Sequence, residues 1–172
     1  DCNLYLFTPE MMSPSGNMLG VWKQTYERIR RVNEFLVGLE NFSKLPAEKN
    51  ELFEGQVRFF RAFLYFQLAK RHGGVILYRN MDLVKDKERS TADETWDFIA
   101  EDLDFAASVL PEVWDANNSG RVTKYAALAL KSRAMLYAER WEAAKEAADK
   151  VIDSGKYSLT SNYADAWKGG NS

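Results

Sequence analysis

The stretch GQVRFFRAFLYFQLAK at residues 55–70 contains a pentapeptide, RAFLY at 61–65, that returns as RAMLY at 133–137. The offset of 72 residues is about twice the period of a two-helix repeat. Each copy is followed by a segment of helical pattern that opens with a tryptophan, Trp96 or Trp141. This internal repeat predicts an all-α fold in which helical hairpins stack on one another.

Alanines occur both in the second copy and in the helical segment that follows it. Ala134, Ala144 and Ala148 recur at helical spacing, and small side chains at such positions let two antiparallel helices approach closely. The pattern therefore predicts TPR-like antiparallel helical hairpins. In the first copy a longer insertion separates the two helices, so we expect long loops and at most a short β segment near residues 75–78.

Apolar residues recurring every three or four positions predict the helices themselves. The predicted helices cover roughly residues 20–41, 47–71, 90–110, 123–140 and 141–154. Ser90 or Thr91 is expected to cap the third helix. Turn-forming residues cluster before the first helix, so residues 1–20 are expected to form an irregular N-terminal loop.

The composition excludes several classes of protein. The chain has 172 residues, and 46% hydrophobic with 28% charged residues is typical of a globular protein. A net charge of −2 lacks the basic excess of a nucleic-acid binder. One cysteine and one histidine exclude an intrachain disulfide and any zinc site that needs two histidines. No run of 18 apolar residues is present, so no transmembrane helix is predicted.

Five segments also match, in order, the motifs of one known family. The matching patterns are Y-x-x-I-x-x-x-N-x-F-L at 26–36, G-x-x-R-F-x-R-A-x-x-Y-F-x-L at 55–68, G-x-V-x-L at 73–77, G-R-x-T-K-x-A-A at 120–127, and V-I-x-S-G-x-Y-x-L-x-x-N-Y at 151–163. The chain therefore resembles the SusD/RagB-like proteins. It departs from the family pattern at Gln56, where glutamate is usual, at His72, where an aromatic is usual, and at Ile76, where proline is usual.

The resemblance implies a function that composition does not reveal. Family members are TPR-like, cell-surface lipoproteins of Bacteroidetes-type bacteria that bind glycans or, in some members, peptides. They sit as lids on a SusC-like TonB-dependent outer-membrane transporter, and they are not enzymes. We therefore expect a non-catalytic protein without a metal or cofactor, which passes an oligosaccharide or peptide to such a barrel and reaches the membrane only through a lipid anchor outside this chain.

Family members are about three times as long as this chain. The resemblance therefore implies that residues 1–172 form a single helical region of a larger domain, with the C-terminal half outside the chain. The alternative interpretation is a TPR-type scaffold that binds another protein in the cytoplasm. A signal peptide ending in a lipidation site upstream of residue 1 would favour the first interpretation.

Ligand contacts are expected from the N-terminal loop and the start of the first helix. Aromatic faces stack on sugar rings and amides bridge hydroxyl groups. On this chemistry the candidates are Asn3, Tyr5, Phe7, Asn17 and Trp22. Trp22 is open to a second interpretation as a core residue.

Other chemistry-bearing residues are interpreted as structural. Glu101, Asp102 and Asp104 are expected to form a solvated helix face, because a glycosidase needs two carboxylates that face each other across a bond. His72 is expected to be a packed ring at a helix end, and Cys2 an ordinary thiol instead of a lipidated one.

The tryptophans and arginines of the repeat receive the same interpretation. Trp96 and Trp141 are expected in the core because of their equivalent repeat positions. The arginines of the motif segments are expected to bridge helices through carboxylates or to cap carbonyls: Arg58, Arg61, Arg121 and Arg133.

Overall fold

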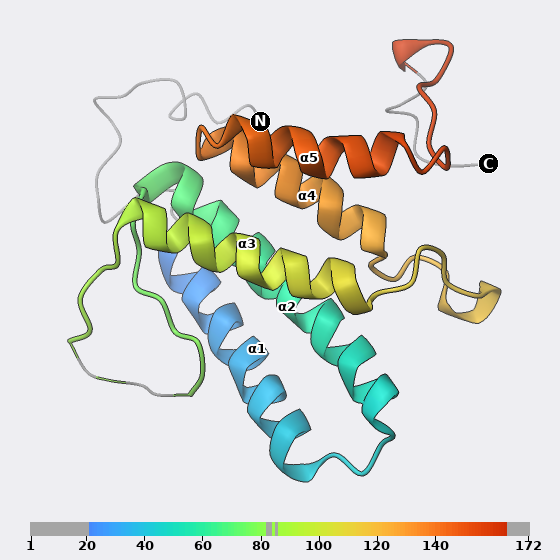
Figure 1. The fold of residues 1–172 in the computed structure, drawn as a ribbon. Helices are drawn as coiled ribbons and strands as arrows, with labels where there is room; N and C mark the ends of the chain where they lie inside the picture. Colours follow the sequence, from blue (N-terminus) through green and yellow to red (C-terminus); the bar gives the residue numbers. More distant parts are fainter. Residues whose placement is uncertain (1–20, 82–83, 85, 165–172) are drawn as a thin grey trace, which may run out of the picture.

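The computed structural model describes residues 21–81, 84 and 86–164. Within this part the fold is all-α, as the repeat predicted (Figure 1). The elements are α1 (Trp22–Phe42), α2 (Ala47–His72), α3 (Ala92–Val109), the 3-10 turn η3 (Ala116–Asn118), α4 (Lys124–Tyr137) and α5 (Trp141–Ile152). Residues 75–78 are extended but form no strand. None of the helices described is long and apolar enough to cross a membrane.

Consecutive helices pack side by side along the chain. Figure 1 shows α1 and α2 as one antiparallel hairpin and α4 and α5 as another, with α3 lying between them. Two long connections interrupt this order, one between α2 and α3 and one between α3 and α4. The arrangement confirms the TPR-like hairpins predicted from the sequence.

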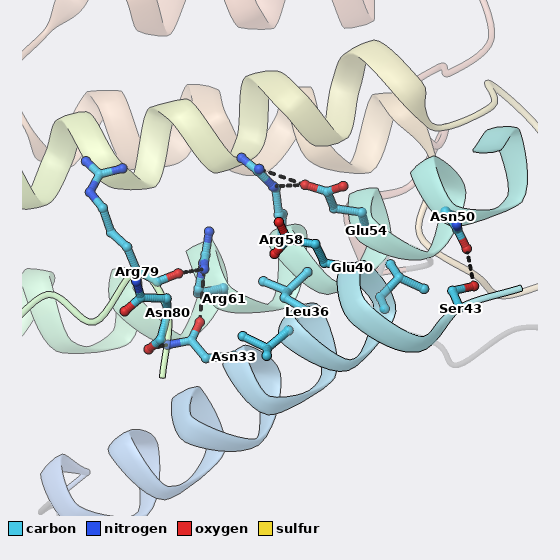
Figure 2. A pocket seen from close by; sticks show the side chains of 12 residues that line it. Asn33, Leu36, Glu40, Ser43, Asn50, Glu54, Arg58, Arg61, Arg79 and Asn80 are labelled. Carbon is cyan, nitrogen blue, oxygen red and sulfur yellow. Dashed lines mark hydrogen bonds and ion pairs between the residues drawn. The ribbon is translucent and has the colours of Figure 1, made fainter. Parts of the chain in front are cut away.

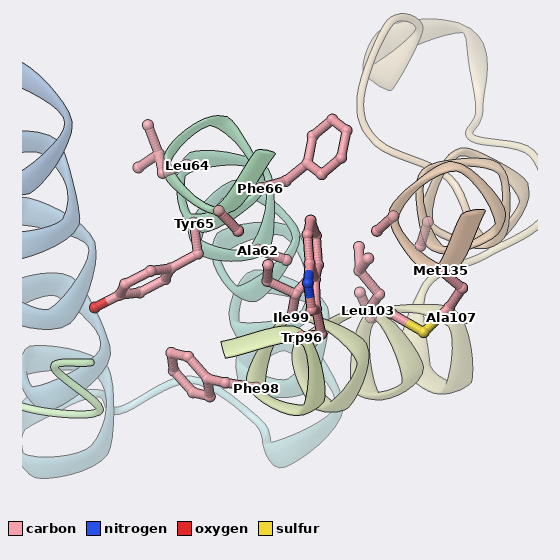
Figure 3. Packing of buried hydrophobic residues seen from close by; sticks show 14 of the residues in the cluster. Ala62, Leu64, Tyr65, Phe66, Trp96, Phe98, Ile99, Leu103, Ala107 and Met135 are labelled. Carbon is pink, nitrogen blue, oxygen red and sulfur yellow. The ribbon is translucent and has the colours of Figure 1, made fainter. Parts of the chain in front are cut away.

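The core lies where α2, α3 and α4 meet. Figure 3 shows side chains of these three helices interdigitating. Large side chains that are almost fully buried there include Tyr65 and Leu68 from α2, Phe98 and Leu103 from α3, and Met135 from α4. Burying an apolar side chain of this size stabilises a fold by about 1.5–3 kcal/mol. Because α2 packs against α1, α3 and α4, its sequence is apolar on more than one side.

Two close approaches between helices depend on small residues. A Cβ added at Gly55 would lie 2.5 Å from a methyl carbon of Val109, so α2 and α3 approach at a point that leaves no room for a side chain. Ala134 is fully buried, and Ala144 and Ala147 of α5 are also buried. Of the two α5 alanines predicted at the α4–α5 contact, Ala144 is buried as expected, but Ala148 is only half-buried and Ala147 is buried instead.

The helix starts follow local capping rules. The Thr91 side chain accepts a hydrogen bond from the Glu94 N–H, and Glu94 in turn accepts one from the Thr91 N–H, which makes a complete capping box. Thr123 caps α4 in the same way through the N–H of Ala126. Of the two residues proposed for the α3 cap, the structure selects Thr91.

The equivalence of the two pentapeptides is only partial. Ala62 and Ala134 are both fully buried, but the other four positions differ in burial between the copies. Tyr65, for example, is fully buried, whereas Tyr137 is 54% exposed. The two helices have different neighbours, α1, α3 and α4 for α2 but α2, α3 and α5 for α4, so different faces of each copy are covered.

The two repeat tryptophans differ in the same way. Trp96 lies in the core, as predicted, but the prediction for Trp141 is wrong because its side chain is 56% exposed. Trp141 is the first residue of α5, while the buried face of that helix is formed by Ala144 and Ala147. The repeat spacing assigned Trp141 to the core, but the structure places it on an exposed face of α5.

Candidate functional site

The connection after α2 contains an extended segment, residues 74–80, whose backbone is held mainly by side chains. Its N–H and C=O groups have no strand partner, yet they are satisfied by residues from α1, α2, α3 and the following loop. Buried backbone groups must find partners, and here they find them outside regular secondary structure. The segment is therefore fixed in place by the helices around it.

From α1, Tyr26 and Asn33 reach this segment. The Tyr26 hydroxyl donates to the carbonyl of Ile76 and accepts from the N–H of the same residue, both at 2.9 Å. The Asn33 amide nitrogen donates to the carbonyls of Tyr78 at 2.9 Å and Asn80 at 3.1 Å. Both residues belong to the first family motif, so that motif positions the segment.

From α2, Arg61 and Tyr65 reach the same segment. Arg61 Nη1 donates to the carbonyl of Arg79 at 2.8 Å and to Asn33 Oδ1 at 2.9 Å. The Tyr65 hydroxyl accepts from the N–H of Tyr78 at 2.8 Å. Burial raises the pKa of Tyr26 to about 12 and also raises the pKa of Tyr65, so both hydroxyls keep their protons above the pH at which an exposed tyrosine ionises.

A buried ion pair orients Arg61. Its Nε and Nη2 donate to the two carboxylate oxygens of Asp102 at 2.7 and 2.8 Å, and the Asp102 side chain is 1% exposed. Arg58 lies 3.6 Å from the same carboxylate. The prediction that Asp102 belongs to a solvated helix face is therefore wrong. Glu101 and Asp104 are exposed, as expected, and pair with Arg79 and Lys131 in separate ion pairs.

The loop that follows the segment completes its anchoring. Lys87 donates to the carbonyl of Leu77 at 2.7 Å, and Arg89 donates to the carbonyls of His72 and Gly74 at 2.6 and 2.8 Å. Cations at the end of α2 also match the negative end of the helix dipole. Segment 74–80 is thus held from both sides.

An aromatic pocket of about 460 Å³ opens between α1 and this segment. Its walls include the rings of Trp22, Tyr26 and Tyr78 together with the side chains of Ile76 and Met81. The Trp22 and Tyr26 ring centroids are 5.1 Å apart and those of Tyr26 and Tyr78 are 6.0 Å apart. Charged and amide side chains also line the pocket, among them Lys23, Glu27, Arg30, Asn33 and Asn80.

A polar pocket of about 430 Å³ lies on the other side of Asn33 and Asn80, between α1 and α2 (Figure 2). Figure 2 shows most of its polar side chains paired with one another. Arg58 bonds Glu54 at 2.7 Å, and the Ser43 hydroxyl donates to Asn50 at 2.7 Å. Asn33 and Asn80 line both pockets and so separate them, and Asn33 is held in place by its bond from Arg61 of the buried ion pair.

The aromatic pocket has the chemistry of a sugar-binding surface. Its aromatic rings can stack on the apolar face of a pyranose ring, and the surrounding amides and charged groups can bond the hydroxyls. Of the three carboxylates considered as catalytic candidates, Asp102 is bound in the buried ion pair, and Glu101 and Asp104 each pair with an exposed or partly buried cation. Among the residues that the structure describes, no three histidine, cysteine or acidic side chains are grouped to hold a metal.

The predicted ligand contacts are only partly placed by the structure. Trp22 lines the aromatic pocket, where its ring also meets the edge of His72 at 5.1 Å. His72 makes this one ring contact but is exposed, so the packed-ring interpretation holds only in part. The other four predicted contacts and Cys2 lie outside the described residues: Asn3, Tyr5, Phe7 and Asn17.

The motif arginines divide between buried and exposed roles. Arg58 and Arg61 join α2 to the Asp102 carboxylate of α3, as predicted for arginines that bridge helices. Arg133 is exposed, and Arg121 lies over the ring of Trp114 at 5.6 Å from its centroid. The bridging role therefore belongs to the first copy of the repeat.

Sequence reasoning missed the roles of Tyr26 and Asn33. Both lie on the face of α1 that carries the buried Ile29, and apolar residues at 3-and-4 spacing along this face indicate a stripe that faces the core. A polar residue such as Asn33 on an apolar stripe needs a buried partner. That signal was present in the sequence, but the partners are 45 and 47 residues away.

Comparisons with known proteins found a matching family model and similar sequences. A family model described as "Starch-binding associating with outer membrane" matches residues 4–136. Two proteins of Formosa agariphila, SusD-like protein P25 and SusD-like protein P38, are 24% identical over 153 residues and 30% identical over 145 residues. These alignments cover 87% and 82% of this chain but only 29% and 27% of the two relatives.

Solved structures show the same similarity. A SusD-like protein from Bacteroides fragilis is 36% identical, with a TM-score of 0.80 over 87% of this chain and 30% of that one. A SusD-like carbohydrate binding protein from the same organism is 28% identical, with a TM-score of 0.74 over 83% of this chain and 28% of that one. The chain therefore spans less than a third of the length of each of these four relatives.

Proposed function

Because this chain belongs to the SusD-like family, we propose that its full-length protein is a cell-surface glycan-binding protein. It captures an oligosaccharide, or a peptide, and passes it to a SusC-like TonB-dependent outer-membrane transporter. It is held at the outer membrane by a lipid anchor outside this chain, and it does not alter its ligand. Residues 1–172 supply one helical region of the larger domain; the irregular loop expected at residues 1–20 lies outside the described residues.

The observation that carries this proposal is the family match over residues 4–136, which spans four of the five described helices. The carbohydrate-binding description of a relative at 28% identity supports the ligand class. The aromatic pocket supports it independently, because three aromatic side chains and two amides line one space of about 460 Å³.

Within this chain we assign ligand contact to the aromatic pocket, with Trp22 as its principal aromatic side chain. Asn3, Tyr5, Phe7 and Asn17 remain proposed contacts from the segment that precedes Trp22. Each aromatic contact with a sugar is modest, so useful affinity is expected from several contacts acting together.

The experiment is isothermal titration calorimetry of the full-length protein against soluble starch, laminarin, xylan, mannan and a mixed peptide pool. Trp22→Ala should weaken binding about 2- to 10-fold, as expected for the loss of one aromatic contact. Trp141→Ala is the matched control, because Trp141 is exposed at the start of α5 and does not line the pocket. Its affinity should equal that of the wild type.

The alternative is a TPR-type scaffold that binds another protein. Binding of no glycan or peptide by the full-length protein, together with capture of a folded protein partner, would favour that alternative. Equal affinity in the Trp22→Ala variant and the wild type would remove the aromatic pocket from the binding surface and leave glycan binding to other parts of the protein.

A further inference from the structure

We propose that Tyr65 is a positioning residue for ligand binding: it does not line the aromatic pocket, but it fixes Tyr78, one of the pocket's aromatic walls. The inference rests on the proposed function and adds to it a residue that acts on the ligand only through Tyr78.

The backbone of Tyr78 is held at both of its polar atoms by side chains from two different helices. Its N–H donates to the Tyr65 hydroxyl at 2.8 Å, and its carbonyl accepts from the Asn33 amide at 2.9 Å. Tyr78 belongs to no helix or strand, so no backbone ladder fixes its position. A longer bond of 3.5 Å from the Tyr65 hydroxyl also reaches the Tyr78 carbonyl, so side chains of α1 and α2 fix the backbone from which the Tyr78 ring extends.

The Tyr65 hydroxyl is itself rigidly placed. The side chain is fully buried, and its ring packs edge-on against Phe98 with centroids 5.2 Å apart. Figure 3 shows the Tyr65 ring pointing away from Phe66, with its hydroxyl on the side where α1 lies. The Tyr65 hydroxyl lies at the edge of this packed core and is held in position, because a small movement of the ring would clash with its neighbours.

The ring of Tyr78 is ordered relative to the other pocket aromatics. It meets Tyr26 edge-on, at an interplanar angle of 87°, and the Lys87 ammonium lies 5.4 Å from its centroid. Stacking on a sugar requires a defined ring plane, and positioning groups raise affinity by fixing that plane before the ligand arrives. Without the Tyr65 hydroxyl, the Tyr78 N–H loses its partner, and the Tyr78 ring can move within the aromatic pocket.

The test is a double-mutant cycle in the full-length protein, with affinities measured against the same panel of starch, laminarin, xylan, mannan and peptides. Tyr65→Phe removes one oxygen and keeps the buried ring, and we expect it to weaken binding about 3- to 10-fold. Tyr78→Ala should weaken binding by at least as much. Adding Tyr65→Phe to Tyr78→Ala should change the affinity no further, because the residue that it positions is then absent.

Tyr125→Phe is the control for a merely structural effect. The Tyr125 side chain is also buried, its ring packs edge-on against Tyr157, and it does not line the aromatic pocket. The control should leave the affinity of the folded protein unchanged.

Three results would overturn the inference. Wild-type affinity in Tyr65→Phe, with weakened binding in Tyr78→Ala, would leave the pocket as a binding surface but remove the positioning role. An equal loss on adding Tyr65→Phe to Tyr78→Ala would show that Tyr65 acts through another residue. Wild-type affinity in Tyr78→Ala, or no binding of any panel member by the wild type, would reject the aromatic pocket together with the inference.

Discussion

Replacing Asp102 by alanine should destabilise the protein by about 3–5 kcal/mol, because it leaves the Arg61 guanidinium buried without its counter-charge. The Arg61 side chain is only 5% exposed and cannot turn to solvent without disrupting the α2–α3 contact. The substitution also removes two charge-assisted hydrogen bonds of 2.7 and 2.8 Å, each worth about 1.5–3 kcal/mol.

The remaining contacts of Arg61 limit the loss. Its Nη1 keeps the bonds to Asn33 Oδ1 and to the carbonyl of Arg79. The two lost hydrogen bonds to Asp102 would together cost about 3–6 kcal/mol. Because Arg61 keeps these other bonds, we expect a loss of about 3–5 kcal/mol, the range typical of a buried ion pair that loses one partner. Since folded domains are stable by only about 5–15 kcal/mol, this single change consumes a large fraction of the total.

Urea denaturation followed by circular dichroism at 222 nm measures this loss. Asp104→Ala is the matched control, because Asp104 lies two residues further along α3, is 57% exposed and pairs with Lys131. An exposed pair is worth about 0–1 kcal/mol, so the control should lose no more than that. The double variant Arg61→Met with Asp102→Leu should be more stable than Asp102→Ala, because it leaves no unpaired buried charge.

A loss below about 1 kcal/mol for Asp102→Ala, equal to that of the control, would refute this reasoning. It would mean that Arg61 reaches water in solution, and that the wall between the two pockets is not held by a buried ion pair.

Three further predictions concern packing and pH. Ala134→Leu should overpack the α4–α5 contact and cost about 1–3 kcal/mol, seen as a lowered melting temperature; an unchanged melting curve would show that the contact is loose. Gly74→Ala should reduce folded protein in a proteolysis assay, because the added Cβ would lie 2.1 Å from the Ser90 carbonyl oxygen; wild-type resistance would contradict this geometry. Burial raises the pKa of Tyr26 to about 12 and that of Tyr65 further, so the folded state keeps protons that the unfolded state loses near pH 10. Stability should therefore fall as the pH rises above about 10, and absorbance at 295 nm should show tyrosines that ionise only on unfolding; complete ionisation in the folded protein near pH 10 would contradict the burial.

The helices could be predicted from the sequence because their signals are local. Apolar spacing, the Thr91 cap and the glycine at the end of α2 each act within a few residues, and the observed ends agree closely with those predicted. The fold class followed from the repeat and from the family motifs. The packing of individual side chains was harder to predict. Trp141, for example, has the helical spacing of a core residue but is exposed.

The site depends on contacts between residues that are distant in the sequence. Asp102 carries a charge, and a charge on a helix is assigned to solvent unless its partner is known; that partner, Arg61, is 41 residues away. The β-prone run at 75–78, where at most a short β segment was expected, forms no strand. Its side-chain partners Tyr26 and Tyr65 were not foreseeable, because strand propensity indicates an extended backbone and not what bonds to it.

The most direct test of the central claim is to incubate the purified full-length protein with each polysaccharide of the panel, to measure binding by calorimetry, and to follow the length of the glycan by chromatography. The account predicts saturable binding of at least one glycan, weakened by Trp22→Ala, with the glycan recovered at its original length. Release of shorter sugars, abolished by a point substitution in this chain, would contradict the claim that the protein captures its ligand without changing it.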